Sequence, residues 1–210
     1  MRWTLMVVLI GSIAFSMTYG GGGVLVGYLP GDVVKLPIDF NLKFEDGVVI
    51  LGGYGGGGVG WYSGGMGGGG EKTLKDASGN EYVLDVGFGM GYFYKRLGWK
   101  NLGLEAGIGI GDLSVGLSRI VNEGSTDIGS FVEGRSEGKL DMSIDYVSIF
   151  PVLSLTLKVV PFLEISAHAI GVLGYSFWGW KFETGTPVDL ENQDRFFLGY
   201  TLCLGLSWGF

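Results

Sequence analysis

The sequence predicts an all-β chain that folds as an antiparallel transmembrane β-barrel of 8 strands, or of 10 if residues 21–45 add a hairpin. Of its 210 residues, 47% are hydrophobic and only 17% are charged, whereas a soluble domain usually carries about 25% charge. After residue 20, no run of 18 apolar residues is free of charge or dense glycine. The hydrophobic residues alternate with a period of two instead, as side chains do on the two faces of a β-strand.

Residues 1–20 have the three-part pattern of a secretory signal peptide. Arg2 is the only charge, an apolar run extends from Leu5 to Phe15, and small or polar residues follow. This run of about 11 residues is shorter than the ~20 residues of a membrane-spanning helix. We therefore expect the segment to be cleaved on export, with a retained N-terminal anchor helix as the alternative.

Residues 21–80 are expected to form glycine-rich N-terminal strands and a loop. Within them, 13 of the 19 residues in the segment 52–70 are glycine, which costs backbone entropy and needs a structural reason. We expect a pair of strands packed where side chains do not fit, with a mobile loop or plug as the alternative. A phosphate-binding loop is disfavoured because Glu71 stands before Lys72, where the motif requires glycine.

Residues 81–210 are expected to form the regular antiparallel strands. Over 81–94, the large residues occupy even positions, which we assign to the lipid: Tyr82, Leu84, Val86, Phe88, Met90, Tyr92 and Tyr94. Over 100–110, leucine and isoleucine again take the even positions and mainly glycine the odd ones. Beyond Gly111-Asp112 the large residues move to odd positions, which predicts a tight turn there and a separate strand over 112–121.

The C-terminal segment 194–210 alternates most clearly. Every even position from Phe196 to Phe210 is large and apolar, and the positions between them are mostly small. Aromatic residues stand at both ends of this stripe and leucines in the middle, an order typical of a lipid-facing strand. Two further strands are expected over 140–159 and 162–180.

The connections are expected to divide between the two ends of the barrel. Counted back from the C-terminus, the long polar loops 122–139 and 183–193 fall at one end. Tight turns at 76–80, 111–112 and 160–161 fall at the other end, and 95–99 is a short connection at the loop end. Transmembrane barrels have this division between short turns and long loops.

With these features the chain resembles a bacterial outer-membrane β-barrel protein of the small, eight-stranded type. The resemblance rests on the export signal, the alternating strands and the final run YTLCLGLSWGF. It implies export through the inner membrane, a location in the lipid bilayer of the outer membrane, and a monomer. It also implies that the outer-membrane assembly machinery reads a C-terminal signal made of Tyr200, Leu204, Leu206, Trp208 and Phe210.

The interior of an eight-stranded barrel is just wide enough to be filled by side chains. Six polar residues are expected to face it: Asp85, Glu105, Lys158, Glu164, Ser166 and His168. Because buried charges must be paired or solvated, we expect a polar network that fills and rigidifies the lumen. The alternative is a lumenal site in which Glu164 and His168 act as acid and base.

The sequence offers no clear catalytic constellation. A G-x-S-x-G match over 134–138 lies in a charged loop, not between a strand and a helix as the hydrolase motif requires. We expect no enzymatic activity, no cofactor and no metal, and the net charge of -7 argues against nucleic acid as a partner. The expected role is structural or surface-binding, with a side-chain-filled or narrow lumen. Alternatives are a secreted soluble β-sandwich or lipocalin-like ligand binder, and an outer-membrane enzyme or narrow channel.

Overall fold

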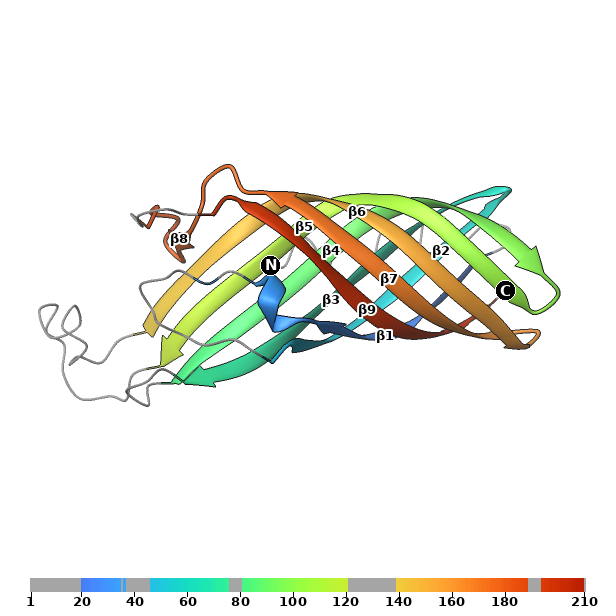
Figure 1. The fold of residues 1–210 in the computed structure, drawn as a ribbon, viewed down its shortest axis with the longest axis horizontal. Coiled ribbons are helices and arrows are strands. Elements are labelled where there is room, and N and C mark those ends of the chain that lie inside the picture. The colour runs from blue at the N-terminus through green and yellow to red at the C-terminus, as the bar shows by residue number, and fades with distance from the viewer. Residues whose placement is uncertain are drawn as a thin grey trace, which may run out of the picture.

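The computed structural model describes residues 20–34, 36, 46–75, 81–120, 139–188 and 194–209. Within these residues, eight long strands form a closed antiparallel barrel (Figure 1). They are β1 (Gly20–Leu29), β2 (Val48–Val59), β3 (Trp61–Lys75), β4 (Glu81–Trp99), β5 (Leu102–Ile120), β6 (Lys139–Val160), β7 (Leu163–Tyr175) and β9 (Phe196–Trp208). Each pairs with the next along the chain, and β9 pairs with β1. The predicted eight-stranded barrel is confirmed.

Two short elements lie near one end of the barrel. The 3-10 helix η1 (Gly31–Val33) follows β1. The two-residue strand β8 (Lys181–Phe182) pairs with the first residues of β6, at Met142 and Ser143. Among the described residues, no helix is long and apolar enough to cross a membrane.

Tight turns join the strands at the opposite end (Figure 1). Gly60 connects β2 to β3, Lys100-Asn101 connects β4 to β5, and Pro161-Phe162 connects β6 to β7. Gly60 and Lys100 both have positive φ, 77° and 54°, which suits such turns. The expected 160–161 turn is confirmed. The assignment of 95–99 as a connection was wrong, because these residues belong to β4. Residues 76–80 lie outside the described residues; the strand ends on either side of them, Lys75 and Glu81, lie at the loop end and not at the turn end.

The expected hairpin at Gly111-Asp112 is also wrong, because β5 continues through both residues as one strand. Odd positions face inward along all of β5. Before position 111 the large residues point out, with Ile110 67% exposed; after it they point in, with Leu113 2% exposed. The change of parity therefore marks the place where the strand leaves an apolar environment, and the chain does not turn there.

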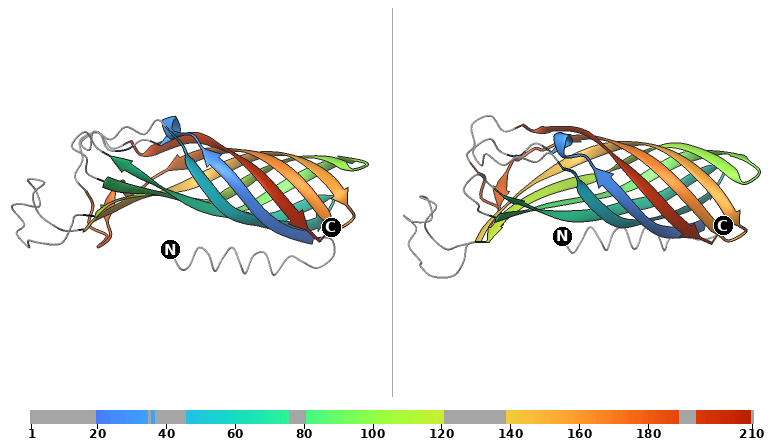
Figure 2. Two further views of the ribbon diagram at one scale, coloured as in Figure 1. Left: turned by 90° about the horizontal axis from the view of Figure 1, so that it is seen from below. Right: turned by 60° about the horizontal axis from the view of Figure 1, so that its bottom comes forward.

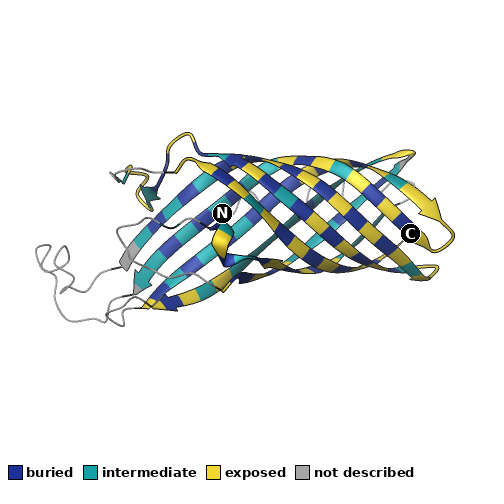
Figure 3. Cartoon of the chain, in the orientation of Figure 1, coloured by how far each residue is buried: buried dark blue, intermediate teal, exposed yellow. Residues whose placement is uncertain are grey.

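Between Gly111 of β5 and the tight turns, the outer surface carries an apolar belt, visible as the alternating exposed positions in Figure 3. From here on, the end with the tight turns is called the lower end and the loop end the upper end. We define the belt as the outward side chains between the tight turns and the level of Ile110 and Val147. On β9 the expected lipid-facing residues Tyr200, Leu204, Leu206 and Trp208 all point outward, from 40% to 67% exposed. Phe210 lies outside the described residues. A β-sandwich or lipocalin-like protein would bury these side chains or replace them by polar ones, so the soluble alternative is contradicted.

On β4 the assignment of the two faces was reversed. Tyr82, Phe88 and Tyr92 are only 5%, 8% and 5% exposed and point into the barrel. Alternation separates the faces of a strand without showing which one is inside. Six inward positions of β2 and β3 are glycine, at 52, 56, 58, 64, 68 and 70, so the large side chains of β4 fill the space that these positions leave.

Residues 52–70 form β2, the Gly60 turn and most of β3, so the expected pair of strands is confirmed. At the inward positions Gly52, Gly64 and Gly70, an added Cβ would come within 3.0 Å of atoms of the neighbouring strand. Such close approach requires glycine.

Strands β3 to β6 continue beyond the belt, past the end of β1, as Figure 2 shows. In this extension the pattern inverts: outward positions are polar, such as Asp112 and Asp145, while inward positions form an apolar core. Trp180 and Phe197 close this core, at 3% and 5% exposure. The barrel thus has an apolar exterior suited to lipid in the belt, whereas the extension has the polar exterior and apolar interior of a soluble β-protein.

Candidate functional site

The lower lumen holds a charged cluster centred on Arg96 of β4. Its guanidinium group forms an ion pair with Glu164 of β7, and Nη1 lies 3.4 Å from Oε1 of Glu105 on β5. Nη2 also donates a hydrogen bond to Oγ1 of Thr156 at 3.0 Å. One cation therefore joins four consecutive strands, β4 to β7, through charge-assisted hydrogen bonds.

A second network surrounds His168 of β7, which is 4% exposed. Its Nδ1 lies 2.7 Å from Oγ of Ser154, and its Nε2 lies 2.7 Å from Oγ of Ser166. The hydroxyl groups of Ser166 and Tyr54 are 2.8 Å apart. The Tyr54 ring meets the imidazole edge to face, with centroids 4.9 Å apart. Both ring nitrogens are thus satisfied by neutral partners.

Stacked tyrosines fill the remaining width of the lower lumen. The Tyr62 and Tyr94 rings stack with centroids 5.2 Å apart, and Tyr92 and Tyr94 stack at 5.0 Å. Inward glycines provide the space for large side chains: an added Cβ on Gly107 would come within 2.6 Å of Tyr94 Cβ. Polar and aromatic side chains therefore occupy the lower lumen, and the apolar core lies above them.

The structure brings together four of the six residues expected in the lumen: Glu105, Glu164, Ser166 and His168. Lys158 is half-buried at the lower end, opposite Glu164 in the strand register, and makes no ion pair within the described part of the chain. Asp85 is a correction, because it lies on the outer face of the extension, directly opposite Glu71. The reversal of β4 explains this error.

The same reversal concealed the residue at the centre of the cluster. Arg96 shares the even parity of Tyr92 and Tyr94, so assigning that face to lipid removed it from consideration. Ser154 and Thr156 could have been found, because they alternate with Leu153, Leu155 and Leu157 along β6. Tyr54 gave no signal, since it stands alone among glycines.

This arrangement can seal the lumen. Among the described residues, no group of three or more His, Cys, Asp or Glu could hold a metal ion. Cys203 is buried beside His168 in the register of β7 and β9, and its Sγ lies 3.8 Å from Oγ1 of Thr201.

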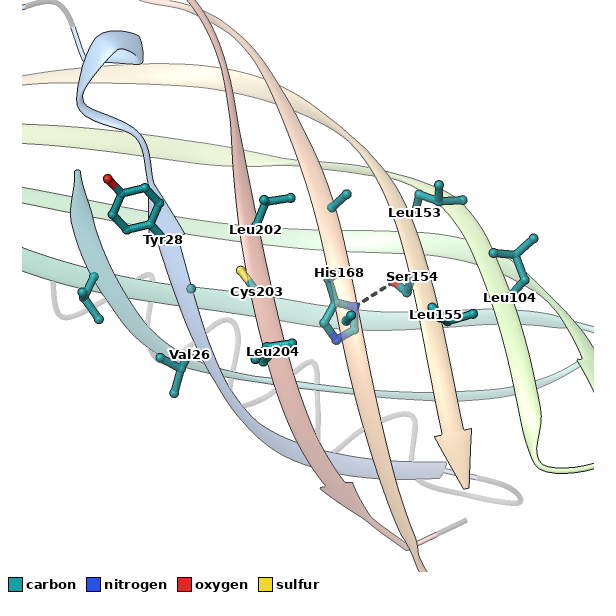
Figure 4. Close-up of a pocket in the computed structure, with 14 residues that line it drawn as sticks. Val26, Tyr28, Leu104, Leu153, Ser154, Leu155, His168, Leu202, Cys203 and Leu204 are labelled. Atoms are coloured by element: carbon teal, nitrogen blue, oxygen red, sulfur yellow. Dashed lines mark hydrogen bonds between the residues drawn. The ribbon is translucent and has the colours of Figure 1, made fainter. Parts of the chain in front are cut away.

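The belt contains an apolar groove of about 630 Å³ on the outside of the barrel (Figure 4). It runs across the strands between two rows of outward side chains. The upper row includes Tyr28, Leu202, Ala169 and Leu153; the lower row includes Val26, Leu204, Ala167, Leu155 and Leu104. Between the rows, the floor is formed by Gly27 and by Cys203, His168 and Ser154, whose side chains point inward.

Neither a protein-family model nor a curated protein matches the sequence. Solved structures do match the fold. Ail, the attachment invasion locus protein of Yersinia pestis, in complex with the heparin analogue sucrose octasulfate, has a TM-score of 0.51 and 12% identity, over 92% of this chain and 100% of that one. A second structure of Ail gives a TM-score of 0.50 and 11% identity, over 91% and 97% of the two chains. The fold is that of a small outer-membrane barrel.

Proposed function

We propose that this protein is an outer-membrane β-barrel with a closed lumen and a structural or surface-binding role. The observation that carries the proposal is the apolar belt, in which side chains such as Leu204 and Ile110 are 67% exposed. Burying such surface in lipid removes it from water, which is favourable in proportion to its area. The similarity to the Ail barrel supports the same membrane.

Membrane insertion is tested by electrophoresis of the refolded protein in detergent, with and without boiling. We expect the folded barrel to migrate differently from the boiled chain, and the protein to fractionate with outer membranes. A mature chain that remains soluble and monomeric without detergent would contradict the proposal.

The orientation supports surface exposure of the loop end, because the long loops of such barrels lie outside the cell. It is tested by placing a single cysteine in the Cys203→Ser background. Thr184→Cys, at an exposed position of the β7–β9 connection, should react with a membrane-impermeant maleimide on intact cells. The matched variant Lys100→Cys, in the turn at the opposite end, should react only after the envelope is permeabilised. The reverse pattern would contradict this orientation.

A closed lumen is supported by the Arg96 cluster below and the apolar core above it. We expect no stepwise conductance when the protein is reconstituted in planar bilayers. We also expect no enzymatic activity, since His168 is enclosed between two serine hydroxyls at 4% exposure.

Surface binding by this protein is expected to differ from the binding of a heparin analogue seen in Ail. Outward charges of the extension are mainly acidic in the described residues: Glu71, Glu81, Asp85, Asp112, Asp141 and Asp145, against Lys75 and Lys181. Like charges repel, so we propose that a sulfated polyanion is not its ligand. Immobilised heparin should not retain the purified barrel at low ionic strength, where electrostatic attraction is strongest.

A further inference from the structure

The two rows that border the apolar groove of the belt continue past it to a charged side chain. They continue in register from β5 onto β4: Leu153 lies opposite Ala106, and Ala106 lies opposite Lys95. In the lower row, Leu104 lies opposite Leu97. The groove itself extends from Tyr28 and Val49 to Leu104. The rows that border it continue in register to Lys95 and Leu97, near the turn end of β4.

Lys95 is unusual in this position. Among the described residues, every other outward side chain of the belt is uncharged. Its ammonium group lies 5.8 Å from the ring centroid of Trp61, a cation–π contact at the first residue after the Gly60 turn. A lysine near the end of a membrane strand extends its charge toward the lipid headgroups. Lys95 therefore places one positive charge near the turn end of the belt, beside the start of β3.

The groove has the direction for a hydrocarbon chain. Ala169 in its upper row and Ala167 in its lower row leave space between the flanking leucines, and Ala106 follows Leu153 where the upper row continues onto β5. From Lys95 on β4 to Leu202 on β9 the path crosses four strand spacings, about 19 Å at ~4.8 Å each. Because the strands tilt about 40°, the path rises about 12 Å, close to the ~15 Å of one leaflet.

We propose that this groove binds an anionic glycerophospholipid of the inner leaflet. The negatively charged headgroup pairs with Lys95 beside Trp61, and one acyl chain lies between the two rows, over the floor at Ser154 and His168. Charge complementarity selects the headgroup, since Lys95 is the only charge in the belt within the part of the chain that the structure describes. This inference rests on the membrane insertion proposed above and adds a ligand class to it.

The test is native mass spectrometry of the barrel released from nanodiscs that contain equal amounts of phosphatidylglycerol and phosphatidylethanolamine. We expect the wild type to retain phosphatidylglycerol preferentially. Lys95→Gln should reduce this preference about fivefold, the effect of one lysine near an anionic headgroup, and Lys95→Arg should keep it. Lys75→Gln, which removes a lysine from the extension, is the matched control and should change nothing.

The path of the acyl chain is tested separately by filling the groove. Ala169→Leu narrows it between Leu153 and Leu202 while Lys95 stays in place, and should lower lipid retention. Gly91→Leu places the same side chain on the outer face outside the groove, where the nearest atom to a new Cβ is 3.9 Å away, and should leave retention unchanged. If Ala169→Leu does not fold, Ala169→Val is the replacement.

Two results would overturn the inference: equal retention of both lipids by the wild type, or a preference that survives Lys95→Gln. Retention that survives Ala169→Leu would overturn the assignment of the acyl chain. Each variant is first checked for heat-modifiable mobility. A wild type that lacks this mobility contradicts the proposed membrane insertion, a failure distinct from folded barrels that bind lipid without preference.

Discussion

Gly205 of β9 provides the space that the ring of Tyr54 of β2 occupies inside the barrel. A Cβ at position 205 would come within 2.8 Å of Cε1 and 2.9 Å of the hydroxyl of Tyr54. That hydroxyl is also the partner of Ser166, so the absence of a side chain on one strand permits the hydrogen-bond network on another.

Gly205→Ala is therefore expected to displace Tyr54 and weaken its contact with Ser166. Overpacking of this kind destabilises by about 1–3 kcal/mol. The measurement is urea unfolding of the refolded barrel, followed by tryptophan fluorescence. Gly91→Ala, where space is available, is the control and should change the free energy of unfolding by less than about 0.5 kcal/mol. Equal stabilities of the two variants would show that Tyr54 adapts freely.

Arg96→Met should be much more damaging, because it leaves Glu164 and Glu105 without their cation. Removing one partner of a buried ion pair costs about 3–5 kcal/mol. Adding Glu105→Gln and Glu164→Gln to Arg96→Met removes the buried charges and should recover most of the lost free energy of unfolding. A single variant as stable as the wild type would mean that the cluster contributes nothing to the closed lumen.

If the belt faces lipid, the loss of stability caused by an introduced charge should depend on whether the charge lies in the belt or in the extension. Leu202→Lys places a cation at the middle of the outward stripe of β9 and should lower the stability in lipid vesicles by about 2–4 kcal/mol. Thr73→Lys introduces the same side chain on the extension, where the position is exposed, and should be tolerated. Equal effects of the two substitutions would contradict the lipid assignment.

Deletion of Phe210 should affect assembly of the barrel in cells without affecting the stability of the folded barrel. If the assembly machinery reads Tyr200, Leu204, Leu206, Trp208 and Phe210, deleting Phe210 should lower the amount of folded barrel in cells. The purified variant should refold in detergent as well as the wild type, because the deletion removes only the last residue. Unchanged assembly in cells would remove Phe210 from the proposed signal.

The class of fold could be predicted from the sequence because a lipid-facing stripe has a pattern that few other structures share. The stripe of β9 was predicted correctly, and so was the outward face of β5 up to Ile110. The number of strands agreed with the structure because two errors cancelled. The expected strands 100–110 and 112–121 are the single strand β5, and β1 was not among the eight strands expected.

The faces of β4 could not be predicted because they depend on residues far away in sequence. Tyr92 and Tyr94 fit inside only because the inward positions of neighbouring strands, such as Gly64 and Gly107, have no side chain. For the same reason Arg96 was missed, although Glu105 and Glu164 were found. The parity change at Gly111 was recognised but misread, since a turn and a membrane boundary give the same local pattern.

The unequal lengths of the strands also determine where the connecting segments start. The chain leaves β1 at Leu29, one residue after Tyr28 of the belt. By contrast, β5 continues ten residues beyond Ile110, which raises its end about 25 Å above the belt at ~3.3 Å per residue and a tilt of about 40°. In a cell envelope coated with sugar chains, an approaching macromolecule would reach the end of β5 first. The end of β1 lies at the depth of the lipid headgroups. The loop end of the barrel is therefore oblique, and the connecting segments on the β1 side and on the β5 side start in different chemical surroundings.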